Sequence, residues 1–228
     1  MIDLEYEIVR SPRRRKLTIT VERDRTVTVH APEGTPEDEV RRAVDAKRQW
    51  ILAKMRHPQK YQNRLHPPGK EVVSGESAPY LGRDYRIEVT DTASGEVEFM
   101  DRFLVPPSHQ TRRRQVLRDW YIARAHETIL ARAKQHACEL GVEFAGAKIV
   151  DTRYRWGSCT VRDNVSFNWR LIKAPMGVID YVIVHELAHL IEPNHTGRFW
   201  NIVRAKTPTM EKAKTWLKEH GQVLEAEV

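Results

Sequence analysis

The chain has 228 residues, and its 38 lysines and arginines outnumber its 31 aspartates and glutamates, which gives a net charge of +7. Two cysteines cannot form a disulfide framework, so a cytoplasmic protein is expected and a disulfide-rich secreted domain is excluded. No apolar run is long enough to span a membrane, and the first residues lack the pattern of a secretion signal, so no membrane partner is expected.

Residues 1–70 predict a small sheet, a helix and a linker, and form the first of two expected domains. Apolar and polar residues alternate over residues 4–31, which predicts an antiparallel sheet. Pro36 suits the start of a helix, and a single helix is expected from there to about Met55. Residues 57–70 contain three prolines and predict a linker or long loop.

Residues 71–228 form the second expected domain, in which strands and helices occur in separate runs. The longest helix is expected to follow Pro107 and to end near Gly141, because glycine suits the position after a helix. Strands are expected near residues 71–90, 95–105, 146–155 and 164–172, and further helices near residues 182–191, 196–206 and 208–220. This order of elements is typical of an α+β fold.

The helix expected at residues 182–191 carries the pattern His185-Glu186-Leu187-Ala188-His189. Residues four apart lie on the same face of a helix, so His185 and His189 can bind one metal ion. Glu186 is then placed to act as the general base for a metal-bound water. A glutamate in an otherwise apolar helix is costly to bury, which favours this catalytic role over a purely structural one.

His195 is the expected third ligand. Pro193 should end the helix because proline lacks an N–H group, and the chain can then turn back towards the metal. Three histidines leave a fourth position open for water, as in catalytic zinc sites, so one Zn²⁺ or another transition-metal ion is expected per chain. Three glutamates remain as alternative third ligands, namely Glu192, Glu211 and Glu219. A ligand at Glu192 would place all three donors in a line along one helix, which suits a tetrahedral ion poorly.

The residues around this pattern resemble a known family. They include Arg155-Trp156-Gly157-Ser158-Cys159, Asn168-Trp169-Arg170-Leu171, the stretch 179–190 and Asn194-His195-Thr196-Gly197-Arg198-Phe199-Trp200. Over about residues 150–205 they are similar to the YgjP-like metal-dependent hydrolases, relatives of the SprT and Spartan zincin metallopeptidases. The resemblance implies a zincin-like catalytic domain, a mixed sheet plus an active-site helix, with its core at residues 145–206.

The resemblance also implies roles for individual residues. His185, His189 and His195 would be the metal ligands and Glu186 the general base. In zincins an edge strand beside the site commonly holds extended substrate, and residues 165–170 are the candidate for it.

Polar residues near the motif are further candidates. Four of them can contact substrate or stabilise the transition state, namely Arg153, Arg155, Asn168 and Arg170. Asn168 and Asp180 can also accept a hydrogen bond from a metal-binding imidazole. Cys159 is expected to be an inert thiol, with a regulatory metal ligand as the alternative.

Basic residues are concentrated in two short runs, Arg13–Lys16 and Arg112–Arg114. Residues 1–70 contain 16 Lys/Arg against 10 Asp/Glu, whereas residues 71–114 contain 6 against 8. Clustered cations attract phosphate backbones, so nucleic acid is a candidate partner. A solvated surface is the alternative explanation, because no nucleic-acid-binding motif accompanies the runs.

Together these features predict a zinc-dependent metallopeptidase that acts on a peptide or protein, with water activated by Glu186 and nucleic acid as a candidate accessory partner. Two alternatives stay open. A nucleotide phosphohydrolase would direct the same metal and water at a phosphoanhydride held by arginines, although Mg²⁺ with oxygen ligands usually serves phosphates. A non-catalytic nucleic-acid-binding module would keep a structural metal site, which an intact Glu186 argues against.

Overall fold

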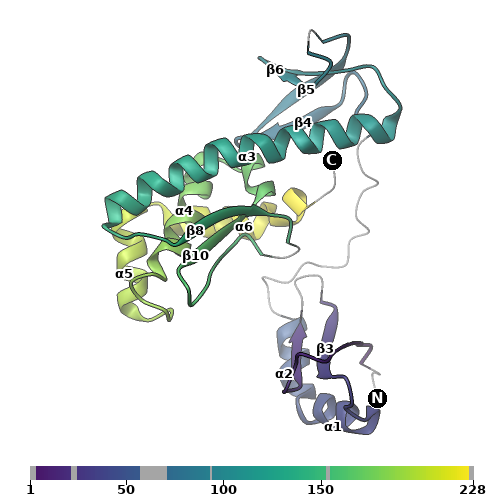
Figure 1. The fold of residues 1–228 in the computed structure, drawn as a ribbon, viewed down its shortest axis with the longest axis vertical. Helices are drawn as coiled ribbons and strands as arrows, with labels where there is room; N and C mark the ends of the chain where they lie inside the picture. The colour runs from purple at the N-terminus through teal and green to yellow at the C-terminus, as the bar shows by residue number, and fades with distance from the viewer. Residues whose placement is uncertain (1–3, 22–24, 57–70, 93, 153–154, 226–228) are drawn as a thin grey trace. The chain divides into compact units, whose positions relative to one another are not determined.

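The structure is a computed structural model, and it describes residues 4–21, 25–56, 71–92, 94–152 and 155–225. The chain divides into two compact units, residues 1–65 and 66–228, and each unit has its own hydrophobic core. The linker expected at residues 57–70 lies outside the described residues. Both units combine strands and helices, so the α+β prediction is confirmed (Figure 1). In the part of the chain that is described, no helix is long and apolar enough to cross a membrane.

Within its described residues, the first unit has a three-stranded sheet in the order β1-β3-β2, formed by β1 (Glu7–Ser11), β2 (Thr18–Val21) and β3 (Val27–Pro32). The prediction of an antiparallel sheet was wrong for one pair of strands. Strand β2 runs antiparallel to β3, whereas β1 runs parallel to it. Alternating apolar residues mark the buried face of a strand, but they carry no information on the direction of its neighbour.

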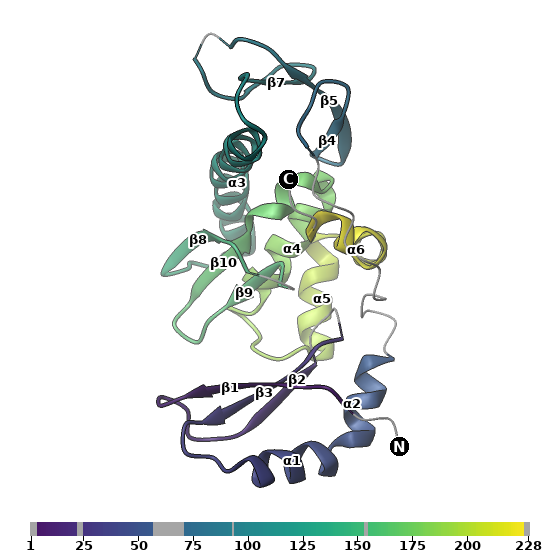
Figure 2. The ribbon, with the colours of Figure 1, turned by 90° about the vertical axis from the view of Figure 1, so that its right-hand side faces the viewer.

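Two helices, α1 (Glu37–Ala46) and α2 (Arg48–Met55), replace the single helix that was expected in this unit. The break falls at Lys47, whose backbone leaves helical geometry at φ −104° and ψ 10°. Neither proline nor glycine marks this position, so the sequence pattern could not indicate it. Val40, Val44 and Ile51 are buried in one core with the apolar residues of the sheet, and α1 lies along one of its faces (Figure 2).

The described residues of the second unit form two small mixed sheets. The first has the order β4-β5-β7-β6 and is formed by β4 (Ser77–Tyr80), β5 (Arg83–Val89), β6 (Glu98–Phe99) and β7 (Phe103–Val105). The second has the order β8-β10-β9 and is formed by β8 (Gly146–Val150), β9 (Gly157–Cys159) and β10 (Asn164–Asn168). One pair in each sheet is parallel, β5 with β7 and β8 with β10, and the other pairs are antiparallel.

A single long helix, α3 (Gln110–Leu140), runs through the second unit (Figure 1). Its 31 residues correspond to a length of about 46 Å. Every fourth residue from Leu117 to Ala137 is buried, and this stripe faces the 3₁₀ helix η1 (Trp169–Lys173) and helix α4 (Met176–Ala188). The helix ends where the sequence predicted, because Gly141 adopts a left-handed conformation with φ 67°.

Helix α4 lies at the centre of the second unit, where it contacts α3, β9, α5 (Gly197–Lys206) and α6 (Met210–Glu225). The two last helices confirm the predictions near residues 196–206 and 208–220. The strand expected to reach residue 172 ends earlier, at Asn168. The Asn168 side chain accepts a hydrogen bond from the Arg170 N–H at 3.0 Å, and this cap turns the chain from β10 into η1.

Candidate metal centre

Helix α4 places His185 and His189 side by side because they are four residues apart on one helix. Nine of its thirteen residues are buried, which identifies it as a core helix and not as an amphipathic surface helix. A core helix holds its side chains in fixed rotamers, and a ligand that projects from it is therefore preorganised for a metal ion.

The chain after α4 turns back within seven residues and delivers His195. The helix ends at Ala188, earlier than the Pro193 expected from the sequence, because the next N–H groups form tighter turns, with Ile191 donating to the Ala188 carbonyl at 3.1 Å. Thr196 then caps α5, since its side chain accepts a hydrogen bond from the Phe199 N–H. His195 is thus fixed immediately before a capped helix.

Ring nitrogens of the three histidines lie within 4.8 Å of one another, one atom from each residue. The Nε2 atoms of His185 and His195 are 3.1 Å apart. Three nitrogens around a tetrahedral zinc ion at about 2.0–2.1 Å would be separated by about 3.3 Å, so one pair is already close to this spacing. Nitrogen donors in this number suit Zn²⁺ or a similar transition-metal ion. The residues therefore fit the metal that the sequence predicts.

Protonation also suits a metal site. Burial lowers the pKa of His185 to about 4, and the neighbouring His189 and His195 contribute to this shift. Burial and His195 also lower the pKa of His189. Both imidazoles are therefore neutral at physiological pH, which is the form that donates a lone pair to a metal.

The surroundings of the three rings are asymmetric. Nδ1 of His185 is buried without a hydrogen-bond partner among the described residues. The backbone of Glu192 and Pro193 forms hydrogen bonds with the His189 ring. His195 is exposed and stacks on Trp200, with ring centroids 5.5 Å apart and an interplanar angle of 23°. A stacked indole restricts the orientation of the most exposed of the three histidines.

Glu186 is buried, with 8% of its surface exposed, and lies beside β9. Burial raises the pKa of its carboxyl group to about 7, while the charge of Arg155 and a hydrogen bond from the Cys159 backbone N–H oppose this rise. A carboxyl group with a pKa near neutrality can both accept and release a proton, as a general base does.

Strand β9, and not residues 165–170, is the sheet edge beside Glu186. The expectation for residues 165–170 was wrong, because β10 is the central strand of its sheet and both of its edges are occupied. Strand β9 pairs with β10 on one side and contacts α4. The strand order depends on long-range pairing, which a local sequence pattern does not reveal.

The alternative ligands lie outside the histidine cluster. Among the described residues, the only group of three or more possible ligands close enough to share an ion consists of the three histidines, so Glu192, Glu211 and Glu219 do not belong to it. Glu211 instead pairs with Lys214 at 3.2 Å. Burial, followed by the charges of Glu186 and Asp163, raises the pKa of the Cys159 thiol, which favours the inert, protonated form.

The other candidate residues have varied surroundings. Arg153 lies outside the described residues, whereas Arg155 is exposed and acts electrostatically on Glu186. Arg170 pairs with Asp151 and lies over the Trp169 ring at 4.5 Å, so its charge is already neutralised.

Two expected partners of metal-binding imidazoles make other contacts. The Asn168 amide donates to the Thr152 carbonyl at 2.6 Å, which joins the ends of β8 and β10. Asp180 accepts hydrogen bonds from Arg132 of α3 and lies 3.2 Å from Nε2 of His136. Both residues therefore hold secondary structure elements together.

Sequence analysis missed two contributors to the site, Trp200 and Lys214. The ring of Trp200 packs on His195. The ammonium group of Lys214, on α6, lies 4.9 Å from the centre of the Trp200 ring, and its charge also acts on His185. Trp200 follows His195 closely and could have been suspected, but Lys214 is brought near only by the packing of α6 on α4.

The two basic runs differ in structure. All residues of the run Arg13–Lys16 are exposed. In the run Arg112–Arg114, the Arg113 guanidinium donates to the backbone carbonyls of Val72, at 2.7 Å, and Ser108, so it serves packing. The second run therefore offers less free charge than its sequence suggests.

Three convergent histidines with a buried glutamate next to the first define a candidate metal centre of the hydrolase type. The YgjP-like, metallopeptidase domain family matches residues 15–220, and the chain belongs to this family. Two solved structures are similar. The metallopeptidase zymogen jannalysin of Methanocaldococcus jannaschii has 17% identity and a TM-score of 0.37, covering 40% of this chain and 94% of that one. The metallopeptidase zymogen abylysin of Pyrococcus abyssi has 18% identity and a TM-score of 0.37, covering 44% and 100%. No curated protein matches the chain.

Proposed function

We propose that this chain is a zinc-dependent peptidase in which His185, His189 and His195 hold the ion and Glu186 is the general base. The observation that carries the proposal is the convergence of three imidazole nitrogens beside a buried glutamate whose pKa is raised to about 7. The metallopeptidase family to which the chain belongs supports the substrate class.

His185, His189 and His195 would hold the zinc ion, which would supply Lewis acidity to make water a stronger acid and to polarise a carbonyl group. Glu186 accepts the proton of the attacking water and passes it to the leaving amine. The Cys159 N–H and the charge of Arg155 hold the carboxylate in place and keep its ionised form accessible. The exposed side of His195 leaves a path for substrate to the site.

Strand β9 is the proposed support for an extended substrate. The Asn168 N–H donates to the Trp156 carbonyl, and the Thr160 N–H donates to the Asn164 carbonyl, so Trp156 and Thr160 face β10. Because alternate residues of a strand pair with the same neighbour, the backbone groups of Gly157 and Cys159 face the free edge. One of them, the Cys159 N–H, already binds Glu186. The remaining backbone N–H and carbonyl groups of Gly157 and Cys159 can pair with a substrate backbone next to Glu186.

The nucleotide alternative has less support. Arg170, one of the arginines expected to hold phosphates, is paired with Asp151. Arg155 remains available beside Glu186, but a single exposed cation is a weak site for a triphosphate.

Nucleic-acid association is a separate part of the proposal and rests on the exposed run Arg13–Lys16 in the first unit. Both cysteines are unpaired, which supports a reducing, cytoplasmic location.

The test is hydrolysis by the zinc-loaded chain of an unfolded protein panel and a nucleotide panel, with Glu186→Gln as the matched inactive variant. Glutamine keeps the size of the side chain but cannot accept the proton, so zinc content should persist while turnover falls by about two orders of magnitude. Peptide cleavage that disappears in Glu186→Gln supports the proposal. Nucleotide cleavage alone, or wild-type cleavage by Glu186→Gln, would reject it.

A further inference from the structure

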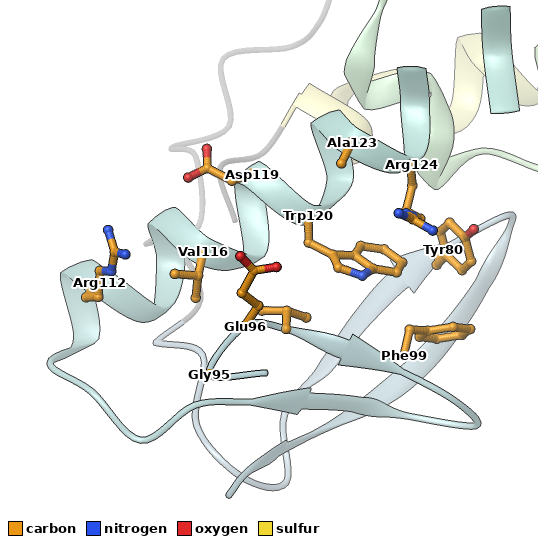
Figure 3. A pocket seen from close by; sticks show the side chains of 11 residues that line it. Tyr80, Gly95, Glu96, Phe99, Arg112, Val116, Asp119, Trp120, Ala123 and Arg124 are labelled. Atoms are coloured by element: carbon orange, nitrogen blue, oxygen red, sulfur yellow. The ribbon is translucent and has the colours of Figure 1, made fainter. Parts of the chain in front are cut away.

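A cavity lies in the same unit as the metal centre but is built from other elements. It has a volume of about 540 Å³, within the range of about 300–1,000 Å³ typical of ligand sites. One wall is a single face of the first half of α3, formed by Arg112, Val116, Asp119, Trp120, Ala123 and Arg124. The opposite wall is formed by the segment from Gly95 to Phe99, which leads into and includes β6 (Figure 3).

Aromatic rings form one end of this cavity. Tyr80, Phe99 and Trp120 contact one another edge to face or tilted, with ring centroids 4.9–5.6 Å apart. Such contacts fix the rings in place before any ligand arrives. The Arg124 guanidinium lies 5.8 Å from the centre of the Trp120 ring, which shows that the indole already accepts a cation on its surface.

Charge in the cavity is unevenly neutralised. Arg124 pairs with Glu127 at 2.6 Å, so its positive charge is largely compensated. Glu96 is exposed, and its carboxylate has no hydrogen-bond or ion-pair partner among the residues described. Figure 3 shows this carboxylate facing α3 between Val116 and Trp120. A carboxylate beside an indole is suited to an ammonium or guanidinium group.

The shape of the cavity suits an extended chain. Its α3 wall runs from Arg112 to Arg124, which is about 18 Å along a helix axis. An extended peptide rises about 3.3 Å per residue, so the wall matches about five residues. Strand β6 is an edge of the four-stranded sheet, and an edge strand can pair with an incoming backbone.

We propose that this cavity binds an extended, basic polypeptide segment, with a lysine or arginine side chain between Glu96 and Trp120. The cavity walls carry two acids, Glu96 and Asp119, and two arginines, Arg112 and Arg124. Because Glu127 compensates the charge of Arg124, a small excess of negative charge remains, and it suits a basic segment. The same charge repels a phosphate backbone, which disfavours nucleic acid as the occupant.

Helix α3 connects the cavity to the metal centre. Trp120 lies in its first half, and Arg132, twelve residues further on, pairs with Asp180 of α4. A segment bound along α3 is therefore held on the same compact unit as the histidines. The interpretation of this segment as part of a substrate rests on the proposed peptidase function. The binding of the segment to the cavity does not depend on that function.

The test is fluorescence anisotropy with the full-length, zinc-loaded Glu186→Gln variant, which cannot consume the probe. The probe is a fluorescein-labelled hexapeptide with alternating phenylalanine and lysine. Its counterparts are the same peptide with glutamate in place of lysine and a labelled oligothymidine. Adding Glu96→Lys should weaken binding of the basic peptide at least about tenfold, and Glu96→Gln should weaken it less. Glu143→Lys makes the same charge change at another exposed acid of this unit and should have little effect.

Equal affinity for the basic peptide in Glu96→Lys and Glu143→Lys would overturn the proposal. It would also be overturned if the acidic peptide or the oligothymidine bound more tightly than the basic peptide. Peptide binding that depends on Glu96 in a chain that cleaves no peptide would retain this site and reject the peptidase. Peptide cleavage combined with peptide binding that does not depend on Glu96 would reject this site and retain the peptidase.

Discussion

Gly157 of β9 and Glu186 of α4 are in such close contact that a side chain at position 157 would force the Glu186 side chain to move. A Cβ atom at Gly157 would lie 2.6 Å from Cγ and 2.8 Å from Oε1 of Glu186. Real Cβ atoms do not approach other heavy atoms this closely, so one of the two side chains would have to move. The glycine therefore determines how near the proposed base lies to the free edge of β9.

Gly157→Ala should displace the Glu186 carboxylate while the histidines keep their places. Zinc content should stay near wild type, and peptide hydrolysis should fall about ten- to a hundredfold, since small displacements of a reacting group have effects of this size. Metal analysis and steady-state kinetics measure the two quantities. Gly177→Ala is the control, because a Cβ atom there meets nothing within 4 Å. Wild-type turnover in Gly157→Ala would show that the close approach has no catalytic role.

His195→Ala should remove most of the bound zinc, whereas Glu192→Ala should retain it. The reason is that His195 offers a nitrogen to the cluster while Glu192 lies outside it. Metal content after dialysis at neutral pH, measured by inductively coupled plasma mass spectrometry, checks this. The opposite pattern, with zinc absent only from Glu192→Ala, would require a different set of ligands.

Trp200→Leu should lower zinc affinity by about ten- to a hundredfold, as removal of residues that orient a ligand commonly does. The indole stacks on His195, the most exposed of the three histidines, and leucine cannot reproduce the stacking. Competition with a fluorescent chelator measures the affinity. Trp216→Leu is the matched control, because Trp216 stacks on His220, which is not a ligand. An equal decrease of affinity in both variants would indicate a general packing effect.

Asp180→Asn should reduce stability by about 1–3 kcal/mol at neutral pH, because Asp180 accepts charged hydrogen bonds from Arg132. Burial disfavours the Asp180 charge, but hydrogen bonds from His136 and Arg132 outweigh it and lower the pKa. An aspartate with a lowered folded-state pKa stabilises the fold above its unfolded pKa of about 3.9, and this contribution disappears as the pH falls through the folded value.

The difference in unfolding free energy between wild type and Asp180→Asn should therefore be largest near neutral pH and vanish in acid. Urea unfolding at several pH values measures it. Glu143→Gln, at an exposed carboxylate, provides the control and should have little effect at any pH. A difference that does not change with pH would rule out the charge of Asp180 as its source.

Replacing Arg13 and Arg15 with alanine should flatten the salt dependence of DNA binding if the exposed run binds phosphates. The slope of log K against log salt should decrease in magnitude by about 0.7–0.9 for each phosphate that the variant no longer neutralises. Anisotropy of labelled oligonucleotides at several salt concentrations measures the slope. Replacing Lys212 and Lys218, both exposed on α6, with alanine removes the same amount of charge and is the control. An identical slope in the two double variants would mean that Arg13–Lys16 is ordinary solvated surface.

Features that depend on local geometry could be predicted from the sequence. The positions of His185 and His189 four residues apart imply a shared helix face wherever the helix lies, and Gly141 marks a helix end because its left-handed backbone is set within a few residues. His195 was also predictable, since the chain between it and His189 is too short to carry it far.

Long-range packing sets which strand lies beside Glu186, how β1 is paired and what surrounds His195, the proposed third ligand. Residues 165–170 have the composition of a strand, but strand order is set by pairing between distant segments, and this makes β9 the edge. The absence of a side chain at Gly157 is required only because β9 packs against Glu186. Lys214 reaches Trp200 only because α6 packs on α4. These contacts arise when separate elements bury their apolar faces together, a step that no local sequence pattern records.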